Sequence, residues 1–94
     1  NPGTVVGLSC IINSRAVVEH DCKLSDAVHI SPGASLGGAC QIQTGAWIGI
    51  GAAVRHGLSV GEFAIVGTGA AVVRHVDAFD VVVGVPARPL KKNG

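Results

Sequence analysis

Aliphatic residues recur at every sixth position over most of the chain. The series is unbroken over Val6, Ile12, Val18, Leu24, Ile30, Leu36, Ile42, Ile48, Val54, Val60, Val66 and Val72. A second series, mostly Ala, Cys or Thr, lies two residues before each aliphatic residue. The position directly after the aliphatic residue is often Gly. A period of six does not fit an α-helix, whose period is 3.6 residues. It indicates a chain that turns sharply at regular intervals, where glycine is useful.

The simplest structure with this period is a triangular coil. Each lap of eighteen residues contains three short strands and three turns, and successive laps stack through parallel hydrogen bonds about 4.8 Å apart. The pattern predicts four laps over residues 4–75, in an all-β parallel β-helix.

Positions eighteen residues apart then lie above one another, so the sequence can be sorted into columns. Three of them hold the residues of interest: His20, Gly38, His56 and Arg74; Ile11, His29, Trp47, Ile65 and Val83; and Ser14, Pro32, Ile50 and Thr68. The second column faces outward by the alternation of the strands, yet it is mostly apolar. It is therefore the best candidate for a subunit interface.

The six-residue register fades after Val72. We therefore divide the chain into a repeat domain, residues 1–76, and a C-terminal segment, residues 77–94, with a strand over 81–85 and a basic end. We expect this segment to pack across the final lap, because an open parallel edge invites aggregation. The chain starts in register and without Met, which favours the C-terminal part of a longer protein.

Composition narrows the class of protein. The chain has 94 residues, of which 48% are hydrophobic but only 3% aromatic, so its interior is narrow and filled with small aliphatic side chains. A net charge of +1 argues against nucleic-acid binding. No apolar segment approaches membrane-spanning length, and we expect no signal peptide before the repeats. A cytoplasmic protein without a membrane partner is the expectation, and oligomerisation often compensates for so small a core.

Several motifs resemble one family over nearly the whole chain. They are Ile11-Ile12-Asn13, His20-Asp21-Cys22, VHISPGA (Val28–Ala34), Ile48-Gly49-Ile50 and GVPAR (Gly84–Arg88). With the hexad rule, they resemble the hexapeptide-repeat acyltransferases, most closely the NeuD/PglD type of sugar O- and N-acetyltransferases. The resemblance implies a left-handed β-helix, acetyl-CoA as co-substrate, no metal, and a homotrimer with cofactor sites between protomers. It also implies a small-molecule acceptor, an amino sugar or nucleotide-sugar. Most members of that family carry an N-terminal nucleotide-sugar-binding domain, which these 94 residues do not include.

Acetyl transfer from a thioester needs a base and hydrogen-bond donors for the oxyanion. His20 is the candidate base, because imidazole titrates near neutral pH and a carboxylate beside it can orient the ring. Asp21 occupies the family's acidic position, and Glu19 is the competing choice. The alternative interpretation of these three residues is a solvated corner. The predicted mechanism is direct transfer to an amine or hydroxyl, without a covalent enzyme intermediate.

Four further residues are candidates for the acetyl-CoA site. Gly38 stacks one lap above His20, where its N–H could meet the oxyanion, although it could also be an ordinary turn glycine. The resemblance implies that His29 contacts acetyl-CoA, with a polar interruption of the apolar column as the alternative. It also implies that Ile50 and Thr68 line the CoA groove, and both could equally be turn residues.

The cations of the C-terminal segment are candidates for attracting the CoA phosphates, although solvated termini are common. They are Arg88, Lys91 and Lys92.

The three cysteines, Cys10, Cys22 and Cys40, all occupy small-residue positions of the repeat. We interpret them as structural filler rather than as nucleophiles or ligands. Cys22 and Cys40 stack at a spacing that permits a disulfide, which a cytoplasmic location disfavours.

Two other functions remain open from the sequence. The γ-class carbonic anhydrases share this fold, and His20 and His56 match the spacing of their first two metal ligands. The third ligand position is Gly61, so a metal site is poorly supported. The other alternative is a trimeric β-helix that serves as a non-catalytic scaffold.

Overall fold

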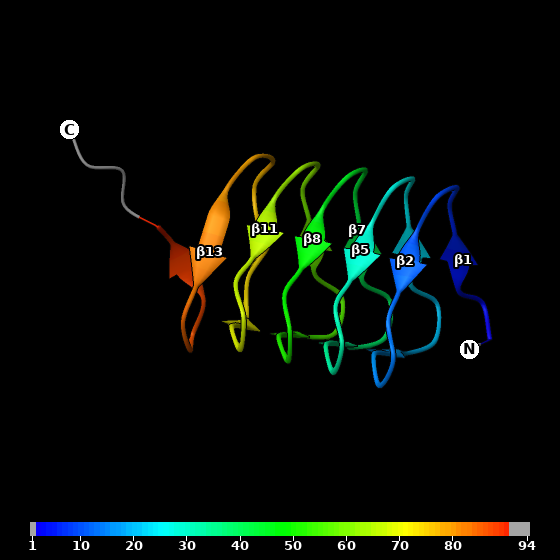
Figure 1. Ribbon diagram of the computed structural model, residues 1–94, viewed down its shortest axis with the longest axis horizontal. Coiled ribbons are helices and arrows are strands. Elements are labelled where there is room, and N and C mark those ends of the chain that lie inside the picture. Colours follow the sequence, from blue (N-terminus) through cyan, green and yellow to red (C-terminus); the bar gives the residue numbers. More distant parts are fainter. Residues whose placement is uncertain (1, 91–94) are drawn as a thin grey trace.

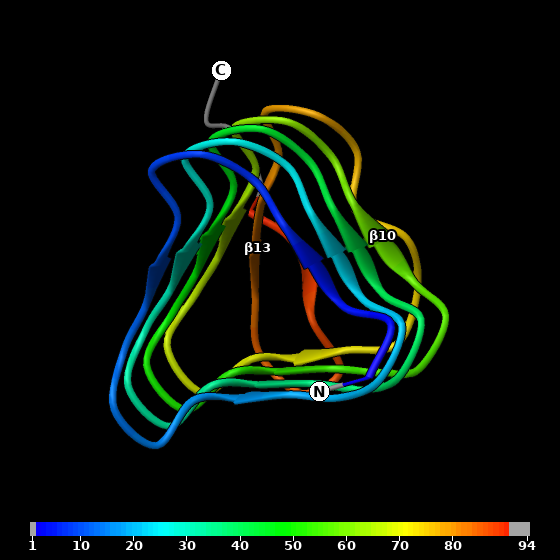
Figure 2. The same cartoon turned by 90° about the vertical axis from the view of Figure 1, so that its right-hand side faces the viewer.

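A computed structural model describes residues 2–90 of the chain. The described chain is an all-β solenoid of about four triangular coils, with short strands stacked along its axis (Figures 1 and 2). Seen from the N-terminal end, the chain runs counterclockwise as it recedes from the viewer (Figure 2). The coil is therefore left-handed, and the predicted fold class is confirmed. No helix that could cross a membrane is present in residues 2–90.

Three sheets form the sides of the triangle, and their pairing is parallel except at the last strand of the second sheet. The first side consists of β1 (Val5–Val6), β4 (Lys23–Leu24), β7 (Gln41–Ile42) and β10 (Ser59–Val60). The second side consists of β2 (Ile11–Ile12), β5 (His29–Ile30), β8 (Trp47–Ile48), β11 (Ile65–Val66), β13 (Val81–Val83) and β14 (Arg88–Pro89). The third side consists of β3 (Val17–Val18), β6 (Ser35–Leu36), β9 (Ala53–Val54) and β12 (Ala71–Val72). Up to β12, paired residues are eighteen apart, such as Val5 and Lys23, which confirms the predicted lap.

The inward side chains form one continuous core. From Leu24 to Val72 every aliphatic residue of the hexad series is buried, and most of the small residues two positions earlier are buried with them. Burying each Val, Leu or Ile is worth roughly 1.5–3 kcal/mol. This stack therefore holds the laps together and fixes the positions of the corners.

The Thr and Cys side chains in the small-residue positions also make hydrogen bonds. Thr4 Oγ1 donates to the carbonyl of Glu19 at 2.9 Å, Cys22 Sγ to that of Gly37 at 3.3 Å, and Cys40 Sγ to that of Arg55 at 3.2 Å. Each donor satisfies a corner carbonyl fifteen residues further along the chain. Cys10, Cys22 and Cys40 are free thiols, in agreement with a structural role.

Glycines that follow the aliphatic residues have a different role from the one the sequence suggests. Gly37 and Gly49 do not have positive φ angles. A Cβ on Gly49 would lie 2.6 Å from the carbonyl oxygen of Val66 in the next lap. These positions therefore need glycine because two laps approach closely, and the sharp turn itself falls two residues later.

The last lap is shorter than the others. Ile65 pairs with Val81, sixteen residues away, so the expectation that Val83 lies above Ile65 was wrong. The hexad pattern had ended at Val72, and the connection to β13 omits two residues of a full lap. As expected, the C-terminal segment packs across this lap: the N–H of Ala87 donates to the carbonyl of Ala71 at 2.8 Å, and β14 pairs antiparallel with β13.

Candidate functional site

His20 and Asp21 lie at the corner between the third and first sides, after β3 and before β4. Asp21 has a φ of 59°, in the left-handed region that Asp tolerates better than most residues. His20 Nδ1 is 3.1 Å from Asp21 Oδ2, and both side chains are well exposed, at 63% and 66%. When Nδ1 donates its proton to the carboxylate, Nε2 carries the lone pair. Such an imidazole can accept a proton from a bound substrate.

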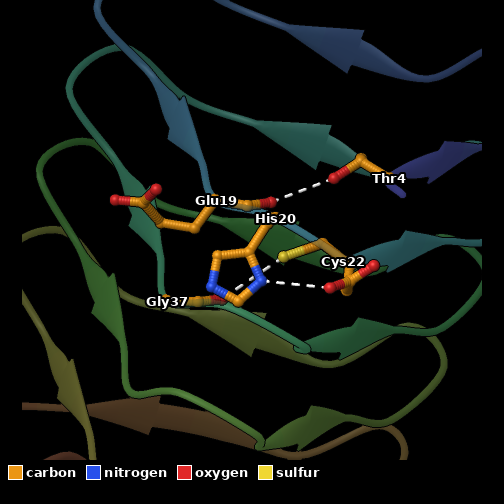
Figure 3. A network of polar contacts seen from close by, with 6 residues as sticks. Thr4, Glu19, His20, Cys22 and Gly37 are labelled. Atoms are coloured by element: carbon orange, nitrogen blue, oxygen red, sulfur yellow. Dashed lines mark hydrogen bonds and ion pairs between the residues drawn. The ribbon is translucent and has the colours of Figure 1, made fainter. Parts of the chain in front are cut away.

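Glu19, the competing acidic residue, does not orient the imidazole. Its carbonyl accepts the Thr4 hydroxyl, and its carboxylate side chain extends away from the His20 ring (Figure 3). Asp21 is therefore the carboxylate paired with His20.

Gly38 supports the His20 ring from the next lap. A Cβ at Gly38 would lie 2.7 Å from His20 Cε1 and 2.8 Å from Nε2, so the imidazole packs directly against this glycine. Within residues 2–90 the Gly38 N–H has no hydrogen-bond acceptor. The corner thus places a free N–H donor beside the free nitrogen of the candidate base.

His29 lies on β5, on the outer face of the second side. Its ring stacks on Trp47 with a centroid distance of 3.9 Å and an interplanar angle of 7°. Asn13 Nδ2 is 3.0 Å from His29 Nε2 and also donates to the carbonyl of Ile30 at 3.1 Å. Because the amide can only donate through Nδ2, Nε2 accepts and Nδ1 carries the hydrogen of a neutral ring. His29 is therefore held as a hydrogen-bond donor through Nδ1.

Beyond its place in the Ile11-Ile12-Asn13 motif, no role was predicted for Asn13. One sequence feature could have pointed to Asn13: it follows Ile12 directly, at a position where Gly often stands. Because Ile11 and Ile12 pair with His29 and Ile30, Asn13 lies one lap below the C-terminal end of β5. Spacing alone does not show that an amide at this point reaches the imidazole.

Ile50 and Thr68 lie at the corner between the second and third sides. Both side chains are exposed. The N–H of Gly69 donates to the carbonyl of Ile50 at 2.8 Å, which keeps the two laps stacked at this corner. This corner borders the sheet that carries His29.

The candidate residues therefore form two groups. His20, Asp21 and Gly38 share one corner, whereas His29, Ile50 and Thr68 lie on and beside the second side. The second side is the one that does not reach the His20 corner of the triangle. One copy of the chain does not bring the two groups together.

Cys40 is unsuited to nucleophilic chemistry. Burial raises the pKa of its thiol above the ordinary value of 9.0, so the group is neutral at physiological pH. The thiol also donates its proton in a hydrogen bond to the carbonyl of Arg55, which favours the neutral form further.

Arg88 is exposed on β14, while the other candidate cations, Lys91 and Lys92, lie outside the described residues. The described part of the chain contains no group of three or more His, Cys, Asp or Glu side chains arranged to hold a metal ion.

Comparisons with known proteins concern the chain as a whole. No model of a known protein family matches the chain. Among solved structures, it superposes on a histidine-to-alanine variant of GDP-perosamine N-acetyltransferase from Caulobacter crescentus, in complex with CoA and GDP-perosamine, with a TM-score of 0.93, 37% identity and 95% of this chain covered. WeeI from Acinetobacter baumannii gives 0.87, 38% and 95%, and the acetyltransferase domain of PglB from Neisseria gonorrhoeae gives 0.84, 34% and 95%.

The chain belongs to the hexapeptide-repeat β-helix family. It covers only 42%, 47% and 52% of these three solved chains, about half of their length. The hexapeptide-repeat chain described here thus matches the solenoid portion that the three structures share.

Proposed function

We propose that this hexapeptide-repeat chain forms the catalytic part of an acetyl-CoA-dependent acetyltransferase. The acceptor would be an amine or hydroxyl group of a sugar or nucleotide-sugar. The observation that carries the proposal is the His20–Asp21 pair, whose free Nε2 lies against Gly38 in a fold shared with acetyltransferases. A cytoplasmic location is part of the proposal, because three free thiols fit a reducing compartment.

In the proposed reaction, His20 Nε2 takes the proton of the acceptor amine or hydroxyl. The acceptor atom attacks the thioester carbonyl carbon, and the oxyanion that forms is met by the Gly38 N–H. The tetrahedral intermediate collapses with cleavage of the C–S bond, and the CoA thiolate takes the proton from the imidazolium of His20. Asp21 orients the ring and stabilises its positive charge.

The donor would bind between protomers of a homotrimer. The Nδ1–H of His29 in a neighbouring copy would contact the acetyl carbonyl, with Ile50 and Thr68 of that copy along the pantetheine arm. Support comes from the separation of the two groups within one copy. It also comes from the exposed apolar residues beside His29, among them Trp47 and Ile65, which are 48% and 44% exposed.

Calorimetric titration of acetyl-CoA, with the mass of the protein in solution measured in parallel, tests the donor first. We expect saturable binding at about one site per chain of a trimer, and CoA release when amino-sugar acceptors are added. A well-folded trimer that does not bind acetyl-CoA would instead support the non-catalytic scaffold.

The role of His20 is tested by the His20→Ala variant. We expect the turnover rate to fall by about 10²–10⁴-fold, the usual contribution of a general base, with acetyl-CoA affinity nearly unchanged. His56→Ala is the matched control, since His56 is an exposed histidine of the same corner two laps away. A His20→Ala variant with more than about a tenth of the wild-type rate would contradict the assignment.

A further inference from the structure

Two exposed phenylalanines stack at the corner between the first and second sides. Phe63 lies between β10 and β11, and Phe79 lies on the following lap, shortly before β13. The ring centroids are 5.7 Å apart with an interplanar angle of 15°, and the two residues are 52% and 67% exposed. This corner, uppermost in Figure 2, carries none of the candidate residues for acetyl transfer. The proposed function therefore leaves this aromatic pair without a role.

Both phenylalanines have a backbone conformation that is unfavourable for a bulky residue. Phe63 has a φ of 56° and Phe79 a φ of 65°, both in the left-handed region. Gly45 occupies the same position of the corner one lap before Phe63, and glycine adopts this conformation without the steric cost. The Phe63 ring packs over Gly45, because a Cβ there would overlap the ring edge. Strain of this kind is concentrated at functional sites, so the aromatic pair is a candidate binding surface.

The surface around the aromatic pair is negatively charged. The segments that meet at this corner are residues 7–10, 25–28, 43–46, 61–64 and 77–80. They contain four carboxylates and no lysine, arginine or histidine. The carboxylates are those of Asp26, Glu62, Asp77 and Asp80, and none of them has an ion-pair partner among residues 2–90. Glu62 and Asp77 are exposed close to the two phenylalanines in the sequence.

This combination of rings and carboxylates favours one kind of partner. A guanidinium or ammonium group is attracted both to the face of an aromatic ring and to a carboxylate. Aromatic residues and arginine are also enriched among the residues that dominate binding energy in protein interfaces. The same corner of a second copy does not fit, because its carboxylates would face these carboxylates with no cation between them.

We propose that the Phe63–Phe79 corner is a docking surface for a basic segment of a partner protein, in which arginine or lysine flanks an apolar side chain. The apolar side chain packs against the two rings, and the cations lie against Glu62 and Asp77. Because the His20 corner is a different corner of the triangle, this partner binds without displacing acetyl-CoA.

NMR titration of isotope-labelled protein with the peptide acetyl-Arg-Leu-Arg-amide tests this surface, and acetyl-Glu-Leu-Glu-amide is the control peptide. We expect the backbone amide signals of residues 61–64 and 77–80 to shift with the basic peptide and not with the acidic one. The affinity should weaken as the salt concentration rises, because exposed ion pairs are screened. Acetyl-CoA binding should be the same with and without the basic peptide.

Two double variants separate the contributions of the rings and of the carboxylates. In Phe63→Gly/Phe79→Gly the affinity for the basic peptide should fall about fivefold or more, because the cation–π contacts are lost. Glu62→Gln/Asp77→Asn keeps both rings and should remove most of the salt dependence. Leu8→Ala is the control for the rings, since Leu8 is an exposed apolar residue of the same corner three laps before Phe63, and it should leave the affinity within about twofold.

Thermal unfolding distinguishes binding from a purely structural role of the rings. The melting temperature of Phe63→Gly/Phe79→Gly should change little, because relief of the backbone strain offsets the lost stacking. A lower melting temperature with unchanged peptide affinity would show that the rings only stabilise the corner, and would overturn the proposal. Equal responses to both peptides, or no shift at the corner, would overturn it as well. Association of wild-type protein that the glycine variant abolishes would assign the surface to a second copy instead of a basic partner.

Discussion

Two residues in contact with His20 control what its imidazole can do. Asp21 accepts from Nδ1, and the absence of a side chain at Gly38 leaves room for the ring edge that includes Nε2. The sequence predicted this pairing because Asp21 follows His20 directly and Gly38 is eighteen residues further. That Gly38 supports the ring sterically, in addition to offering an N–H, could be seen only from the distance between them.

Gly38→Ala tests this steric role. The added methyl group would overlap the His20 ring, so the ring must move away from its present position. We expect the acetyl-transfer rate to fall about 10–100-fold, because a displacement of about 1 Å in a catalytic group has effects of this size. The melting temperature should change little, since the displaced ring is exposed. Steady-state kinetics and thermal unfolding measure both, and an unchanged kcat would show that the contact is incidental.

Cys40 provides a pH-dependent prediction at the same scale. The thiol pKa is above 9.0 in the folded protein and near its ordinary value in the unfolded chain. The folded protein therefore binds the thiol proton more tightly than the unfolded chain does. The stabilisation is complete below about pH 9 and is lost as the pH rises towards the raised pKa of the folded state.

Cys40→Ser removes this titration and keeps a hydroxyl donor for the carbonyl of Arg55. Urea unfolding of both proteins between pH 7 and pH 10.5, a range chosen to bracket the thiol titration, should show a steeper alkaline loss of stability in the wild type. Equal slopes would mean that burial of Cys40 does not perturb its thiol.

At the scale of strands and laps, the hexad pattern was sufficient for twelve of the strands, because each inward aliphatic residue has one place in the core. It was not sufficient for β13. The six-residue period is lost after Val72. No pattern in residues 73–80 indicates how many residues shorter the last lap is than a full lap. The shortening changes a backbone interaction as well: Ser59 N–H donates to the side chain of His75, through Nδ1 at 3.0 Å, instead of to a carbonyl of the next lap.

His75→Ala should therefore destabilise the last lap. Its loss leaves the Ser59 N–H without its acceptor, and one hydrogen bond of this kind contributes about 0.5–1.5 kcal/mol to the free energy of unfolding. His56→Ala is the control, because the His56 side chain makes no hydrogen bond to the described residues. Amide hydrogen exchange should show faster exchange at Ser59 in the variant. Equal stability of the two variants would contradict this role.

At the scale of the whole molecule, the triangular cross-section determines how a site can be assembled. The His20 corner lies between the first and third sides, and His29 lies on the second side, so no motion of a side chain brings them together within one coil. Columns read from the sequence already assigned them to different faces. The repeat pattern predicts the fold of one chain. It does not predict which surface of a second copy contacts the His20 corner.

Mixing two inactive variants tests the shared site. His20→Ala keeps an intact His29, and His29→Ala keeps an intact His20. If each site takes His20 from one protomer and His29 from its neighbour, random trimers of the two variants regain about a quarter of the wild-type sites, because each of the two protomers is suitable with even odds.

The variants are unfolded together, refolded together and assayed for CoA release, and each variant refolded alone provides the background rate. Protein mixed after separate refolding controls for exchange of subunits. Recovery of activity only after joint refolding is the expected result, because protomers must come from different variants to complete a site. If joint refolding restores nothing while wild-type protein survives the same treatment, His20 and His29 do not act in a shared site, and the proposed role of His29 fails although that of His20 is untouched.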